Sequence, residues 1–212
     1  MSSETKGERS VKSIYERTLG SAYEQLHPKL QQRYRITTDH PFCGKGVMED
    51  VSGGGLLVRL FLKMGVKYRL FFSERGKNIP FTIENTVYFN QEGKEVVTWD
   101  RTFSFPKVNR HFDAIMYTDD KQEVTDEFGK PAVLVSTLSF QVNDGAMYIV
   151  PRKQWLLIFG KKLSLPKWLY GQAEIVESYD DNKECFCIAV RVHNTLVGTV
   201  FSYSGTFQEV KS

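Results

Sequence analysis

The chain has 212 residues, of which 41% are hydrophobic, and its 28 Lys and Arg residues almost balance its 25 Asp and Glu residues, leaving a formal net charge of +3. This balance argues against a dedicated nucleic-acid-binding protein, which usually carries a clear basic excess. No apolar run approaches the length of about 20 residues that a membrane-spanning helix needs, and residues 1–10 lack the apolar segment of a secretory signal.

A chain of this length and composition can bury one sizeable core. No linker rich in Pro, Gly or Ser divides it. We therefore expect a disordered N-terminal tail over residues 1–12 and a single domain over residues 13–210.

The first quarter of the chain has the residue spacing of helices. Ser13 and Glu16 form the pattern of a capping box at a helix N-terminus, and apolar side chains then recur at helical intervals as far as Leu26. Pro28 would end that helix or start a second one, which we expect to continue through Tyr34. The sequence thus predicts helices whose apolar faces pack against a sheet, with a partner-binding helix as the minor alternative.

A further short helix is predicted over residues 56–64, between three consecutive glycines at 53–55 and Gly65. Glycines before a helix can hold a phosphate group. The G-x-G-x-x-G spacing and the Lys-Ser/Thr pair of a P-loop are missing here, so we interpret the glycines as a flexible turn.

The second half of the chain, from about Ile79 to Phe207, has the alternation of β-strands. Successive side chains of a strand point to opposite faces, so apolar residues at every second position indicate a half-buried strand. Asn143, Asp144 and Gly145 predict a hairpin turn because these residue types tolerate positive φ. The segments with strand character are 81–89, 97–105, 111–118, 133–142, 147–150, 172–179, 186–192 and 197–207.

Short connections between these segments favour antiparallel pairing, because a parallel crossover needs a dozen or more residues. The predicted fold class is therefore α+β, with N-terminal helices packed on a strongly curved antiparallel sheet or barrel of roughly eight to ten strands. We expect the helices to precede residue 66 and the sheet to follow it. An interior of this size either fills with side chains or holds one small ligand.

Three cysteines, Cys43, Cys185 and Cys187, do not form a disulfide framework, because their number is odd and small. This usage is typical of a reducing compartment and predicts a cytoplasmic protein. The spacings of zinc ligands are missing. We therefore expect no metal and no other cofactor, and we interpret the cysteines as small buried hydrophobes.

Arg101 is the candidate for a functional charge, because alternation places it on an apolar strand face with Trp99 and Phe103. A guanidinium on such a face must be paired or reach solvent. It could hold the anionic head group of a ligand in an apolar cavity, or it could form a structural ion pair with Glu84 or Glu177. The residues predicted on this basis to contact a ligand are Trp99, Arg101, Phe81, Phe103, Phe105 and Glu84.

Catalytic patterns are weak. His111 and Asp113 share a strand face, but no Gly-x-Ser-x-Gly motif accompanies them, and a surface pair is the simpler interpretation. Glu174 and Glu177 lie on opposite faces of one strand and cannot act together as acid and base. We predict no catalytic residue.

Residues 155–170 mix large apolar side chains with lysines, a composition that favours bilayer interfaces. Gly160 and Pro166 would break a long amphipathic helix there. A buried strand, a turn and a strand entering the next hairpin explain the segment better, and peripheral membrane contact is the minor alternative.

Several short motifs occur together: Pro80–Asn85, Val97–Phe103, Arg110–Ala114, Leu163–Leu169 and Gly198–Phe207. With them the chain resembles, from about Tyr15 to Glu209, the bacterial family called domain of unknown function 4166. Members of that family occur alone, behind saccharopine-dehydrogenase-like domains, or behind the membrane segments of YndJ-type proteins. The family has no established activity, so the resemblance implies no functional residue.

Three kinds of function are compatible with these patterns. The sequence favours non-enzymatic binding of a small apolar or amphiphilic ligand in the cavity of a curved sheet. The first alternative is an interaction or accessory module with a filled core, whose protein partner the sequence does not identify. The second is an enzyme with a polar group in the cavity, so enzymatic activity stays open. The volume of the cavity distinguishes a ligand-binding protein from an interaction module. A polar group in the cavity with a shifted pKa would favour the enzyme.

Overall fold

The computed structural model of the protein describes residues 12–119 and 123–210, so the tail expected over residues 1–12 lies outside the described residues except for Lys12. The helical segments are α1 (Ile14–Leu19), η1 (Gly20–Gln25), α2 (Pro28–Tyr34), α3 (Leu56–Gly65), η2 (Val66–Tyr68) and η3 (Lys167–Leu169), where η denotes a 3₁₀-helix. The strands are β1 (Phe42–Ser52), β2 (Gly76–Asn85), β3 (Val87–Phe89), β4 (Glu95–Phe105), β5 (Val108–Thr118), β6 (Val124–Phe128), β7 (Leu134–Asn143), β8 (Ala146–Ile158), β9 (Lys161–Ser164), β10 (Gln172–Asp180), β11 (Cys185–Asn194) and β12 (Gly198–Glu209).

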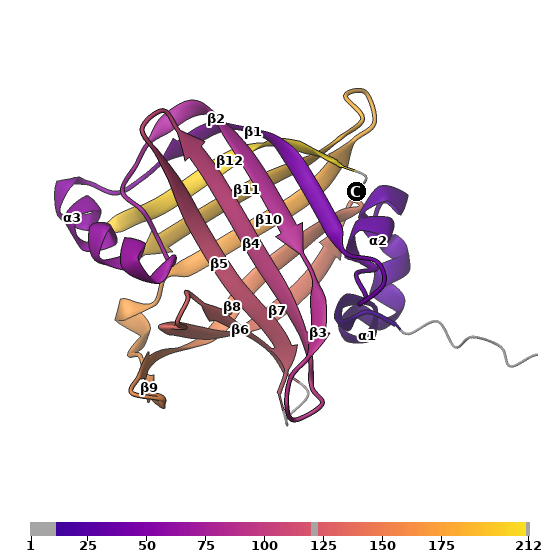
Figure 1. Ribbon diagram of the computed structural model, residues 1–212, viewed down its shortest axis with the longest axis horizontal. Coiled ribbons are helices and arrows are strands. Elements are labelled where there is room, and N and C mark those ends of the chain that lie inside the picture. The colour runs from indigo at the N-terminus through magenta and orange to yellow at the C-terminus, as the bar shows by residue number, and fades with distance from the viewer. Residues whose placement is uncertain (1–11, 120–122, 211–212) are drawn as a thin grey trace, which may run out of the picture.

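Ten of these strands form a closed antiparallel barrel (Figure 1). They follow the order β10-β11-β12-β1-β2-β4-β5-β6-β7-β8, and the pairing of Ile175 with Ile149 joins β10 to β8 and closes the ring. Outside the ring, β3 pairs with β4 and β9 pairs with β8. The structure therefore confirms the predicted fold class of N-terminal helices with an antiparallel barrel.

Two local predictions are confirmed in atomic detail. The hydroxyl of Ser13 accepts a hydrogen bond from the backbone N–H of Glu16 at 3.2 Å, and the Glu16 carboxylate accepts one from the N–H of Ser13 at 2.8 Å, which completes the capping box. Asp144 and Gly145 form the two-residue turn between β7 and β8, with φ of 48° and 75°. Both residues have the positive φ that such hairpin turns require.

The expectation that every strand would follow residue 66 was wrong for β1, which lies between β12 and β2 in the barrel. Glycines interrupt the alternation of this strand. A Cβ atom at Gly46 would lie 2.0 Å from the carbonyl oxygen of Thr206, and one at Gly205 would lie 2.2 Å from that of Val47. Glycine thus allows β1 and β12 to approach closely, and it removes the side chains that would have indicated a strand.

The barrel interior is filled unevenly. Around β2, β4 and β12, aromatic rings pack edge to face, with centroids 5.1 Å apart for Phe81 and Phe103 and 5.1 Å for Phe103 and Tyr203. These side chains are almost completely buried. The facing wall, which includes β7, β8, β10 and β11, carries aliphatic side chains such as Ile149 and Val190 on its inner face. Space is left between the two sides.

The two ends of the barrel differ. Helices α1 and α2 cover one end, and α3 lies at the other (Figure 1). The indole N–H of Trp99 donates to the hydroxyl of Tyr15 in α1 at 2.9 Å, and Arg33 of α2 forms a buried ion pair with Glu177 of β10. In the described part of the chain, no helix combines the length and apolarity that crossing a bilayer would require.

Candidate ligand-binding site

A cavity of about 640 Å³ occupies the unfilled part of the barrel. Its wall is mostly aliphatic and aromatic, with side chains contributed by β4–β8, β10, β11, β12 and α3. Exposed residues such as Leu169, Leu196 and Val197 also line it, so the cavity reaches the surface at the end of the barrel where α3 lies. We call this opening the mouth.

Most polar side chains of the wall already have partners in the protein. Gln154 exchanges two hydrogen bonds with the backbone of Gly171, at 2.6 and 3.0 Å. The amide of Asn194 donates to the carbonyls of Trp168 and Tyr170, both at 2.9 Å. These side chains fix the loops at the mouth and are not available to a ligand.

Glu177 is also occupied. Its carboxylate accepts hydrogen bonds from Nε of Arg33 at 2.9 Å and from a terminal guanidinium nitrogen of Arg33 at 3.2 Å, and both side chains are fully buried. The other terminal nitrogen of Arg33 donates to Asn85 at 3.1 Å. The pair is bidentate and desolvated, so it anchors α2 to the barrel.

Arg101 faces the cavity from β4. Its Nε–H donates to the carbonyl of Phe112 at 2.9 Å, one terminal nitrogen lies 3.5 Å from the hydroxyl of Tyr203, and the guanidinium carbon lies 4.0 Å from the centre of the Phe112 ring. Among the described residues, no carboxylate lies within 4.0 Å of this guanidinium. The predicted ion pair with Glu84 or Glu177 was therefore wrong: Glu84 is exposed, and Glu177 binds Arg33.

Asp126 of β6 also presents a polar group to the cavity. It is 5% exposed, and in the described structure its Oδ1 atom has no hydrogen-bond partner. Burial raises the pKa of Asp126 to about 7; Glu127 also raises it, whereas the positive charge of Arg101 lowers it. A buried carboxyl group of this kind can be neutral and donate a proton, or be ionised and accept a hydrogen bond.

Sequence reasoning missed Asp126 because it assigned no strand to residues 124–128. The pattern was present: Val124, Asp126 and Phe128 alternate at period two, as inward-facing residues of a strand do. The strand is only five residues long and contains two acidic side chains, so its apolar pattern is weak.

The structure places the six predicted contact residues differently. Trp99 and Arg101 line the cavity. Phe81 and Phe103 lie in the aromatic cluster beside it, with exposed fractions of 1% and 0%. Phe105 packs on Phe72, with ring centroids 5.6 Å apart, and Glu84 is on the outside. Contact of any of them with a ligand stays a prediction.

The weak catalytic patterns lie away from the cavity. His111 is 3.1 Å from the hydroxyl of Thr102 through its Nδ1 atom. Asp113 forms an ion pair with Arg69 at 3.0 Å. Neither His111 nor Asp113 belongs to the cavity wall. Their interpretation as a surface pair was wrong, because each binds a different partner and Asp113 is buried.

Fold and cavity together define an antiparallel-barrel protein with an apolar internal site that is closed at one end by helices. The family profile described as "Domain of unknown function (DUF4166)" matches residues 26–207. The chain belongs to this family, which confirms the resemblance found in its motifs. It is also similar to a protein of Bacillus subtilis (strain 168) named "Uncharacterized protein YndH", with 50% identity over 201 residues that cover 94% of this chain and 98% of that one.

Proposed function

We propose that the chain is a non-enzymatic binding protein that holds one small apolar or amphiphilic molecule inside its barrel. The cavity carries this proposal. Its volume of about 640 Å³ falls within the range of roughly 300–1,000 Å³ that is usual for small-molecule sites. It equals the volume of about 20 water molecules in the liquid, and its wall offers few groups to which such waters could bond.

The size of the cavity argues against a packing fault. Packed protein interiors contain few voids larger than a water molecule, and a space of about 640 Å³ is far larger than such a void. An interior with this much free volume is also not the filled core that an interaction module would have.

Arg101 and Asp126 give the proposed ligand an orientation. The guanidinium has no carboxylate partner among the described residues, so it can donate charge-assisted hydrogen bonds to an anionic head group. Protonated Asp126 can donate a further hydrogen bond to the same group through its unpartnered carboxyl. The apolar wall would stabilise the rest of the ligand by about 25 cal/mol for each Å² removed from water. A monocarboxylate with an apolar chain fits this pattern.

One observation favours a second candidate, an enzyme. Asp126 has a pKa near neutrality inside a cavity, and such groups are frequent general acids or bases. The two candidates differ in the fate of the ligand, because a binding protein returns it unchanged.

Fluorescence titration with 11-(dansylamino)undecanoic acid and with its methyl ester tests the proposal. We expect the wild-type protein to bind both probes in equal stoichiometry and to return them unaltered, as judged by mass spectrometry. The Arg101→Leu variant should bind the acid about tenfold more weakly or worse, because a charged hydrogen bond contributes about 1.5–3 kcal/mol, while its affinity for the ester should change little.

Arg191→Leu is the matched control, because Arg191 is exposed on β11 and should leave the affinity for both probes unchanged. A wild-type protein that binds neither probe would overturn the proposal. A probe that is chemically altered by the wild type but not by Asp126→Asn would establish the enzyme instead.

A further inference from the structure

Large apolar side chains surround the mouth of the cavity and point into solvent. They come from α3, from the β8–β9 hairpin with the following η3, and from the β11–β12 turn. Neighbouring residues of the same segments, among them Leu62, Leu165 and Val197, line the cavity. We define the rim as the exposed residues Leu56, Leu60, Phe159, Leu163, Trp168 and Leu196, whose exposed fractions are 83%, 64%, 100%, 58%, 54% and 65%.

The segments that carry the rim are also strongly basic. Residues 53–73 and 145–173 contain no Asp or Glu, and neither does the β11–β12 turn. Five exposed cations lie on the rim segments: Arg59, Lys63, Lys161, Lys162 and Lys167. Their summed charge exceeds the net charge of the whole chain, which is +3, so the rest of the molecule is net negative. The charge asymmetry gives the protein a preferred orientation toward an anionic surface.

Helix α3 illustrates how the two properties combine. Val58 and Leu62 line the cavity, whereas Leu56 and Leu60, one turn apart, are exposed together with Arg59 and Lys63. A helix with only one buried side normally presents polar residues on the other. Here leucines and cations share the outer side, as in helices that lie in a membrane interface.

Phe159 provides an independent observation. It occupies the tip of the β8–β9 hairpin with φ of 47°, followed by Gly160 with φ of 75°. Such turns favour Asn, Asp or Gly, and a bulky residue at positive φ is strained. The Phe159 side chain is 100% exposed, so no contact within the protein offsets the strain. The ring is therefore available for contact with a partner.

We propose that the rim docks the mouth of the barrel on the surface of an anionic lipid bilayer. Phe159, Trp168 and the leucines would enter the interface, where aromatic and aliphatic side chains are stable. The lysines and arginines would contact anionic head groups through charge attraction. Three separate segments around an opening suit a flat, deformable partner better than the groove of a protein. The docking does not depend on the proposed function, but it would bring an apolar ligand to the cavity without passage through water.

Co-flotation with liposomes tests the docking. We expect the wild-type protein to float with vesicles of phosphatidylglycerol and phosphatidylcholine and to bind pure phosphatidylcholine at least tenfold more weakly. Phe159→Ser and the double variant Lys161→Glu/Lys162→Glu should each lower binding to the anionic vesicles about tenfold. Both sites are exposed, so folding should not change. Brominated acyl chains should quench Trp168, with Trp168→Phe as the blank.

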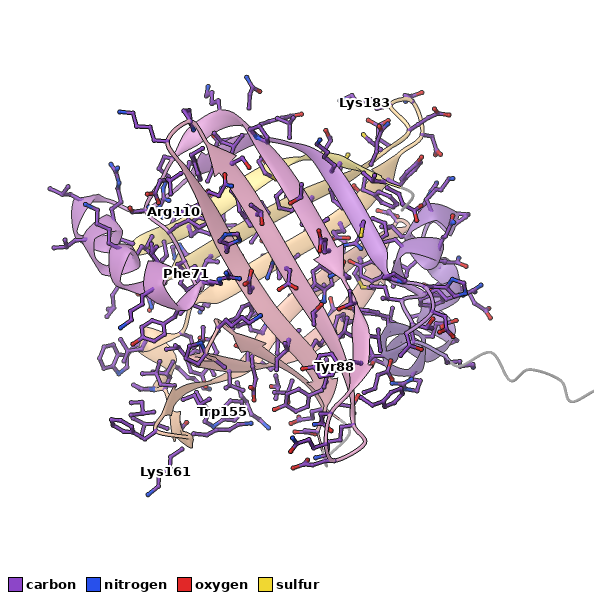
Figure 2. All side chains as sticks on the ribbon, in the orientation of Figure 1. Phe71, Tyr88, Arg110, Trp155, Lys161 and Lys183 are labelled. Atoms are coloured by element: carbon purple, nitrogen blue, oxygen red, sulfur yellow. The ribbon has the colours of Figure 1, made fainter. Side chains whose placement is uncertain are left out.

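Matched controls come from the other end of the molecule. Phe89→Ser removes another exposed phenylalanine, on β3, and Lys29→Glu/Lys183→Glu removes two exposed cations. Figure 2 shows Lys161 and Lys183 on opposite sides of the protein. These variants should float as the wild type does.

A wild-type protein that stays unbound with anionic vesicles would overturn the docking, and so would equal effects of Phe159→Ser and Phe89→Ser. Arg101→Leu should dock normally, which separates the two proposals. Docking without probe binding would support the docking and overturn the proposed ligand site. Probe binding without docking would support the ligand site and overturn the docking.

Discussion

Asp126 is a carboxylic acid placed where its charged form is unfavourable. Burial raises its pKa to about 7 from a usual value of 3.8, although Arg101 offsets part of the effect. Between these two pH values the folded protein binds more protons than the unfolded chain. The contribution of Asp126 to the free energy of unfolding is therefore fully present below about pH 3.8, and it is lost as the pH rises to about 7.

Replacing Asp126 by Asn removes this dependence, because an amide of the same shape does not ionise. We expect Asp126→Asn to resemble the wild type in stability below about pH 3.8 and to exceed it at pH 8, by at most about 4 kcal/mol. Urea unfolding at several pH values measures the difference. Asp39→Asn, at an exposed site, is the control. Parallel stability curves for Asp126→Asn and the wild type would contradict the expected ionisation.

Single residues differ in how far sequence could predict them. Trp99 and Arg101 lie on a long, regular strand, so alternation alone placed them on the inner face. Phe81 and Phe103 share that face, yet they fill the barrel instead of lining the cavity. Local alternation determines which face of the strand a side chain is on. The location of the cavity depends on how the side chains of all the strands pack together, which alternation in one strand does not reveal. The partner of Arg33 is likewise set by tertiary packing between residues 144 positions apart.

At the scale of elements, α2 is held to the barrel by the buried pair of Arg33 and Glu177. Removing one partner leaves an unpaired buried charge, which typically lowers stability by about 3–5 kcal/mol. We expect Glu177→Leu and Arg33→Met each to do so. The double variant Arg33→Met/Glu177→Leu should recover most of the loss, because it leaves no buried charge.

A double-mutant cycle by urea unfolding measures this coupling. The exposed pair of Lys183 and Asp180, whose charged atoms lie 3.9 Å apart, provides the comparison. It should show little coupling, as surface pairs generally do. Additive losses for Arg33 and Glu177 would show that the pair does not anchor α2.

The elements that sequence predicted well are those whose local pattern agrees with their environment. The hairpin at Asp144 and Gly145 and the capping box at Ser13 depend on neighbouring residues only. β1 and β6 were missed for opposite reasons: close packing of strands demands glycine in β1, and the cavity tolerates an aspartate in β6. In both cases the tertiary structure selected residues that weaken the local strand pattern.

At the scale of the whole molecule, a ligand inside the barrel should stabilise every strand that surrounds it. At a probe concentration of 100 times the dissociation constant, the gain is about 2.7 kcal/mol. For a domain of this size that corresponds to a rise in melting temperature of roughly 5–10 °C. Circular dichroism during thermal unfolding measures it with the dansyl probe.

Filling the cavity provides the control. Ala173 lines the cavity, and Ala173→Phe should occupy part of the space that the probe needs. This variant should unfold at the wild-type temperature or above and should lose the rise on adding probe. A rise of equal size in both proteins would place the probe outside the barrel.

The helices α1 and α2 close one end of the barrel and the mouth is at the other, which gives the cavity the topology of a blind tube. A molecule that goes in head first has to come out tail first, along the same path. Two molecules cannot pass each other, so exchange would proceed by departure and then arrival, at a pace that a competitor in solution cannot hasten. A ligand of the proposed kind would therefore enter and leave by the same opening, and the cavity would not act as a conduit.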